Sequence, residues 1–68
     1  MKNLFDPPKT CEGSLVGVDG NAFNVISYFA NCAKEEGWSQ EDILKVRKEA
    51  TSKDYDYLVL TILAHLDD

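Results

Sequence analysis

Three side chains in this 68-residue sequence are of the types that act as general bases or nucleophiles: the histidine His65 and the cysteines Cys11 and Cys32. A general base needs a substrate or nucleophile within hydrogen-bond reach and a partner that orients its ring. His65 has only Asp68 close to it, near the end of the sequence. We expect His65 to be a partly exposed helix residue that interacts with the C-terminal dipole of its helix.

Neither cysteine has the surroundings of a reactive thiol. Cys32 falls on the apolar half of a predicted helix, where a thiol is inert and its pKa rises. Cys11 lies beside Lys9 and Glu12 in an irregular segment, with nothing fixed to activate it. The two cysteines form no C-x-x-C pair, and a zinc site would need carboxylates to complete it. We therefore expect two free thiols rather than a disulfide, no catalytic residue, no metal and no cofactor.

The carboxylates and glycines also fail to match a chemical motif. Asp54 and Asp56 lie two residues apart at a predicted helix start, so they point in different directions and cannot act as a carboxylate pair. A calcium loop beginning at residue 19 would place Phe23 at its fifth ligand position and Ala30 at its twelfth, where oxygen ligands are required. The glycines spell neither a dinucleotide-binding nor a phosphate-binding loop. An enzyme is therefore the class of protein that the sequence favours least.

One group of positive residues could contact a nucleic acid. It crosses the predicted second helix into the next turn and consists of Lys45, Arg47, Lys48 and Lys53. Acidic residues are interleaved with this group, and the chain carries a net charge of −5. Because binding to phosphates depends on clustered Lys and Arg, we expect a solvated face here and do not favour nucleic acid as a partner.

Hydrophobic periodicity indicates three helices that would position these side chains. The first spans about residues 21–36, where Asn21 or Asp19 can cap the start and Gly37 supplies the left-handed residue that ends it. Trp38 follows, and it can pack on both the first and the second helix, so we expect it to be largely buried. The apolar residues of the first helix fall within half of its circumference. They are Ala22, Phe23, Val25, Ile26, Phe29, Ala30, Cys32 and Ala33.

The second helix begins at Ser39, and the third runs from a cap at Thr51 or Ser52 to about Leu66. The third helix is apolar over more than half of its circumference, and such a helix is normally covered on two sides. The residues expected on its inward face are Tyr55, Leu58, Val59, Ile62, Leu63 and Leu66.

Residues 1–13 are predicted to form an extended arm, because Pro7 and Pro8 forbid helix there. Residues 15–18 form a brief β-type run before a turn, but one strand without a partner cannot make a sheet. The sequence thus predicts an all-α fold. It would be a compact three-helix domain over residues 14–68, with an extended N-terminal arm and at most one short strand.

Four apolar side chains fall outside the predicted core stripes: Tyr28, Leu44, Tyr57 and Leu60. One alternative, which we favour, is that the arm folds over them, since a domain this small needs every apolar contact. The arm side chains available for this are Leu4, Phe5, Leu15, Val16 and Val18. The other alternative is that the four residues form a patch for a partner, because exposed contiguous apolar area usually marks an interaction site.

No apolar run approaches the ~18 residues that span a bilayer, and the first residues lack the apolar core of a signal peptide. We therefore expect a cytoplasmic location and no membrane partner.

Residues 15–23 contain a D-G-N-A-F turn, and residues 50–58 contain an A-T-S-K-D-Y-D segment. These segments resemble matching stretches of a small bacterial and phage-borne protein family that has no assigned activity. The resemblance covers about residues 15–66 and leaves the arm outside. It implies a mobile-element origin and carries over no catalytic residue.

Together these patterns favour a small non-enzymatic protein-interaction module, as in an accessory protein of a phage or mobile element. Its partner would be another protein or a second copy of the chain, bound through the four outlying apolar residues. The alternative is a nucleic-acid-binding domain that uses the second and third helices in a helix-turn-helix-like arrangement. Its contacts would be Lys45, Arg47, Lys48 and Lys53.

Overall fold

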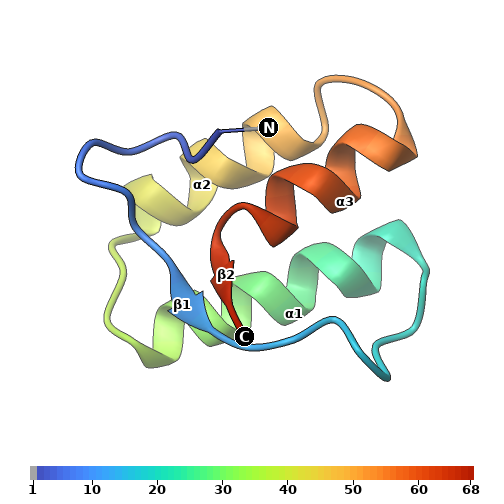
Figure 1. The fold of residues 1–68 in the computed structure, drawn as a ribbon, viewed down its shortest axis with the longest axis horizontal. Coiled ribbons are helices and arrows are strands. Elements are labelled where there is room, and N and C mark those ends of the chain that lie inside the picture. The colour runs from blue at the N-terminus through green and yellow to red at the C-terminus, as the bar shows by residue number, and fades with distance from the viewer. Residues whose placement is uncertain (1) are drawn as a thin grey trace.

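The computed structural model describes residues 2–68 and confirms the predicted all-α, three-helix fold. Helices α1 (Ala22–Glu35), α2 (Gln40–Ala50) and α3 (Tyr55–Leu63) pack against one another in every pairing, with the closest association between α2 and α3. In Figure 1, α3 lies between α2 and α1, and the two short strands lie side by side at one end of the helices. The strands are β1 (Cys11–Glu12) and β2 (Leu66–Asp67), and they run parallel.

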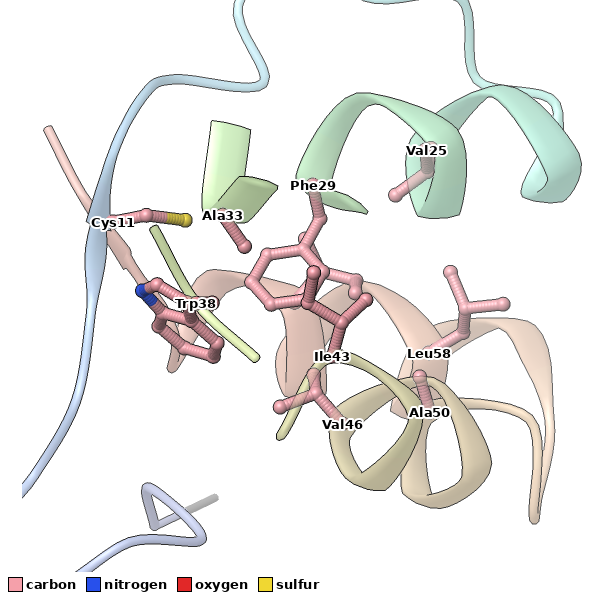
Figure 2. Packing of buried hydrophobic residues seen from close by; sticks show 10 residues of the cluster. Cys11, Val25, Phe29, Ala33, Trp38, Ile43, Val46, Ala50 and Leu58 are labelled. Carbon is pink, nitrogen blue, oxygen red and sulfur yellow. The ribbon is translucent and has the colours of Figure 1, made fainter. Parts of the chain in front are cut away.

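A single core fills the space between the helices, and each helix contributes residues to it. Phe29 from α1, Val46 from α2 and Ile62 from α3 are fully buried. The ring of Phe29 meets the edge of the Trp38 ring, with centroids 5.5 Å apart and the planes at 84°. Figure 2 shows Phe29 at the centre of this cluster, with Val25 and Leu58 at one end and Trp38 at the other. Edge-to-face pairs of this kind stabilise a core beyond their buried area.

The corner between α1 and α2 forms as the sequence predicts. Gly37 has φ +83°, and its N–H donates to the carbonyl of Lys34 at 3.0 Å. The N–H of Trp38 donates to the carbonyl of Ala33, also at 3.0 Å, which completes a Schellman ending. The Trp38 side chain is buried. Ser39 caps α2, because its hydroxyl accepts a hydrogen bond from the backbone N–H of Asp42 in the first turn of the helix. Local hydrogen bonds therefore specify the backbone conformation of this corner.

The boundaries of α3 differ from the sequence prediction. Its N-cap is Asp54, whose carboxylate accepts from the backbone N–H of Tyr57 at 2.9 Å, whereas the hydroxyls of Thr51 and Ser52 donate to carbonyls at the end of α2. The helix ends at Leu63 rather than at Leu66. The residues that follow form β2, because their backbone groups make hydrogen bonds with β1 in place of helical hydrogen bonds.

The strand predicted at residues 15–18 is a turn in the structure, closed by a 3.0 Å hydrogen bond from the N–H of Val18 to the carbonyl of Leu15. Pairing occurs earlier, where the N–H of Cys11 donates to the carbonyl of His65 at 3.0 Å. This position cannot be read from local pattern, because a two-residue strand exists only through its partner at the other end of the chain.

The N-terminal arm, described from Lys2 onward, packs on one end of the helices; Met1 lies outside the described residues. Asn3 organises it: the side-chain oxygen accepts from the backbone of Phe5 at 2.9 Å, and the side-chain nitrogen donates to the carbonyl of Ala64 at 2.9 Å. The Phe5 ring then meets Trp38 and His65 edge-on, at centroid distances of 5.6 and 5.8 Å. The arm therefore covers the Trp38 corner.

We expect Gly37→Ala to lower the free energy of unfolding by about 1–2 kcal/mol, the cost of a left-handed backbone for a residue with a Cβ. A Cβ at this position meets no atom within 4 Å, so the loss would report backbone strain alone. Urea unfolding measures it. The matched control is Gly20→Ala, where φ is not positive and the new Cβ makes only an ordinary 3.5 Å contact. An equal loss in both variants would contradict this account of the corner.

Candidate interaction surface

His65 is fully buried, so the expectation of a partly exposed side chain is wrong. Its Nδ1 lies 2.7 Å from the carbonyl oxygen of Thr61, and its Nε2 accepts a hydrogen bond from the backbone N–H of Leu4 at 3.0 Å. Because a carbonyl only accepts and an N–H only donates, the proton is on Nδ1 and the ring is neutral. Burial lowers the pKa of His65, although the hydrogen bond to Thr61 partly opposes this. The histidine thus fastens the arm to the end of α3.

Both cysteines are free thiols, as the sequence predicts. Cys11 in β1 is buried, with its Sγ 3.7 Å from the carbonyl oxygen of His65. Burial raises the pKa of the Cys11 thiol to about 12, and the neighbouring Cys32 and Glu36 add to the rise. A thiol with that pKa is protonated at neutral pH and cannot act as a nucleophile.

The positive residues on and after α2 are directed to separate places rather than to one face. The ammonium group of Lys45 lies 4.9 Å from the centroid of the Phe5 ring, and that of Lys53 lies 4.5 Å from the centroid of Tyr57. Arg47 instead borders a hollow against α1. Lys48 is exposed. Two of the four charges are therefore engaged with aromatic rings of the chain itself.

The four outlying apolar residues also separate into two kinds. The hydroxyl of Tyr28 accepts a hydrogen bond from the backbone of Ser14 at 2.9 Å. Tyr57 is half-buried, and its hydroxyl donates to the carboxylate of Glu49, which raises the pKa of the phenol. Both tyrosines therefore serve intramolecular contacts.

Leu44 and Leu60 are exposed, at 46% and 50% of their surface. The arm does not cover them, contrary to the alternative that we favoured, because it is held at the Trp38 corner, and Val16 is itself 88% exposed.

Leu60 belongs to a larger apolar surface along α3. Tyr55 and Leu63, which the sequence placed on the inward face, are 45% and 48% exposed. Residues spaced by three or four along a helix lie on the same side, so these side chains form one stripe. We call it the α3 face; its residues are Tyr55, Asp56, Val59, Leu60 and Leu63. Four of them line a shallow hollow of about 550 Å³: Tyr55, Asp56, Val59 and Leu60.

A second apolar hollow lies between α1 and α2. It has a volume of about 300 Å³, and we call it the α1–α2 groove. Phe23 at its border is 65% exposed, although its helical position placed it with the core residues. Sequence reasoning missed this groove, because the apolar half of a helix does not reveal which part of it a neighbour leaves uncovered. The groove is lined by Phe23, Ile26, Ser27, Ala30, Arg47 and Thr51.

A further hollow, of about 420 Å³, is acidic and lies beside the paired strands. It is lined by Thr10, Glu12, Glu36, Asp67 and Asp68. Within residues 2–68, no three Asp, Glu, His or Cys side chains are placed to hold a metal ion. None of the helices in this part of the chain has the length and apolar character needed to cross a membrane.

The buried neutral His65 predicts a specific loss of stability in acid. The pKa of His65 in the folded state lies below its ordinary value of 6.5. As the pH falls below about 6.5, His65 is therefore protonated in the unfolded chain but stays neutral in the folded chain. We expect this residue to reduce the free energy of unfolding by up to about 1.4 kcal/mol per pH unit until the folded pKa is reached. Chemical denaturation between pH 4.5 and 7.5 measures the slope.

The control is His65→Gln, which cannot titrate. It should be less stable at pH 7.5 by about 1–3 kcal/mol, because a buried hydrogen bond is lost, but it should lack the additional slope. Carboxylates contribute to both curves, so their difference reports the histidine. Parallel curves for the two proteins would contradict a buried neutral ring.

Comparison of the chain with models of protein families, with curated proteins and with solved structures finds no match.

Proposed function

We propose that this protein is a non-enzymatic interaction module that binds a protein partner through the α3 face. The observation that carries the proposal is the exposure of Tyr55, Leu60 and Leu63 along one side of a single helix, with Asp56 as the only charge among them. Exposing three large apolar side chains together costs free energy in water, and apolar surface grouped in this way is typical of a docking site.

The rest of the chain is not in a position to cover this face. Asn3 and the hydrogen bond from Leu4 to His65 hold the arm at the C-terminal end of α3, and the arm leaves Tyr55, Leu60 and Leu63 exposed. Tyr55 is itself held at the edge of the α3 face, because its hydroxyl donates to the carbonyl of Gly20 in the turn before α1. The exposed stripe is therefore presented on a braced helix, which lowers the ordering cost of binding.

The surroundings of the side chains that could act as a base or a nucleophile support a binding role rather than catalysis. His65 is buried and already bonded through both ring nitrogens, and the Cys11 thiol is buried and protonated at neutral pH. Neither side chain can reach a substrate without opening the fold. Lys45 and Lys53 lie over aromatic rings, so a nucleic acid would have to compete for them.

Two further features define the setting that we propose. The free thiols Cys11 and Cys32 suit a reducing compartment, so we place the protein in the cytoplasm. The resemblance of residues 15–23 and 50–58 to a phage-borne family supports a role as an accessory protein of a phage or mobile element.

The test is site-specific photo-crosslinking in cells that express the full chain, with a photoreactive residue in place of Leu60. The matched control replaces Leu44, which is exposed to a similar degree but lies on α2 outside the α3 face. We expect a discrete protein adduct from position 60 and none from position 44.

Excess unlabelled protein should suppress the adduct, whereas Leu60→Asp should compete at least about tenfold less well, a loss of roughly 1.4 kcal/mol in binding free energy. Leu60→Asp should still fold, because a substitution at an exposed site changes stability by only about 0.5 kcal/mol. Equal adducts at both positions, or full competition by a folded Leu60→Asp variant, would refute the proposal.

A further inference from the structure

The two apolar surfaces of this chain carry opposite charges. The α1–α2 groove has Phe23, Ile26 and Ala30 in its lining, with Arg47 as its one charged residue. The shallow hollow on the α3 face has Tyr55, Val59 and Leu60, with Asp56 as its one charged residue. Each surface therefore combines apolar area with a single charge, and the signs are complementary.

Neither of these charges has a partner within the described part of the chain. In residues 2–68 the ion pair present joins Lys9 to Asp42, with 2.6 Å between the nitrogen and oxygen atoms. Arg47 and Asp56 take part in no side-chain hydrogen bond or ion pair there. A guanidinium beside an apolar hollow suits a carboxylate that arrives together with apolar side chains, because the pair is then partly shielded from water.

The shapes of the surfaces point the same way. Phe23 projects at the border of the groove with 65% of its surface exposed, and the α3 hollow of about 550 Å³ offers a place for such a ring. Leu60, half exposed, can in turn enter the groove of about 300 Å³. A hollow of that volume is at the lower limit for ligand pockets, ~300–1,000 Å³, and so fits a side chain better than a cofactor.

Pairing each surface with its own copy is less favourable. Two α3 faces in contact would bring Asp56 near a second Asp56, and two grooves would bring Arg47 near a second Arg47; like charges across an interface oppose association. The groove is formed by α1 and α2 and the face by α3, and they share no residue. One chain can therefore use both surfaces at once.

We infer that the partner of the α3 face is a second copy of this chain, which receives it in the α1–α2 groove with Asp56 paired to Arg47. This inference rests on the proposed function and assigns its partner. The contact is heterologous, so successive copies add head to tail and form a ring or an open chain rather than a closed two-fold dimer.

The association should be weak and sensitive to salt. Helix α3 has nine residues, about 14 Å of helix, and so presents less area than the ~800 Å² per partner of a standard interface. Analytical ultracentrifugation up to about 1 mM chain covers the range expected for such contacts. We expect the average mass to rise with concentration beyond that of a dimer, and to fall when salt screens the exposed ion pair.

Charge reversal distinguishes this arrangement from any two-fold dimer. Arg47→Asp disables the groove and leaves the α3 face intact, and Asp56→Arg does the reverse. Each variant alone should associate at least about tenfold more weakly. An equimolar mixture should recover assembly beyond the dimer, because each unaltered groove then meets an unaltered face and each reversed groove meets a reversed face. The double variant, with both charges exchanged, should recover assembly beyond the dimer.

Circular dichroism establishes that each variant is folded, and the neutral variants Arg47→Gln and Asp56→Asn serve where a reversal disturbs its helix. Leu44→Asp is the matched control and should assemble as the unaltered chain does. A chain that remains monomeric to about 1 mM, or a mixture of the two reversals that does not assemble beyond the dimer, would overturn the inference. If position 60 nevertheless crosslinks to another protein, the α3 face is still a docking site and only its assigned partner is wrong.

Discussion

The three helices share one core around Phe29, and that core is too small to bury all the apolar side chains of α3. Leu58 and Ile62 face Phe29 and its neighbours, and they occupy the side of α3 that α1 and α2 can reach. Residues 2–68 place no further layer on the opposite side. The exposure of the α3 face is therefore a consequence of size and topology together, and it leaves apolar surface that a partner can bury.

The arm does not relieve this exposure, because it completes the core at another place. Its Phe5 ring packs over Trp38 and His65. Phe29 contacts the same two rings, and all four contacts are edge-on. The backbone of Leu4 satisfies the buried Nε2 of His65, which would otherwise be an unpaired acceptor in an apolar site. The end of the chain beyond α3 is held in turn by the pairing of β2 with β1. The arm is therefore held by the end of α3, and the residues after α3 are held by β1.

The D-G-N-A-F turn and the A-T-S-K-D-Y-D segment meet in the structure. Tyr55 in the second segment donates to the carbonyl of Gly20 in the first, while Asn21 and Asp54 cap the helices that follow. These contacts join the start of α1 to the start of α3. They also leave Phe23 and Asp56 pointing to solvent on the groove and on the α3 face, so the same segments both brace the fold and supply its exposed surfaces.

The sequence by itself determined the features that depend on neighbours along the chain. The left-handed Gly37 and the Ser39 cap follow from interactions within about one helical turn, and the three helices follow from hydrophobic periodicity along the chain. The burial of Trp38 was also predicted, but Phe29 and Phe5 complete it from farther along the chain. The tertiary structure alone decided the rest. His65 is buried because Leu4, 61 residues away, bonds to it, and the strands form because Cys11 meets Leu66. Hydrophobic periodicity shows which side of a helix is apolar. It does not show how much of that side the neighbouring helices cover. The extent of this cover decided that Tyr55, Leu63 and Phe23 are exposed.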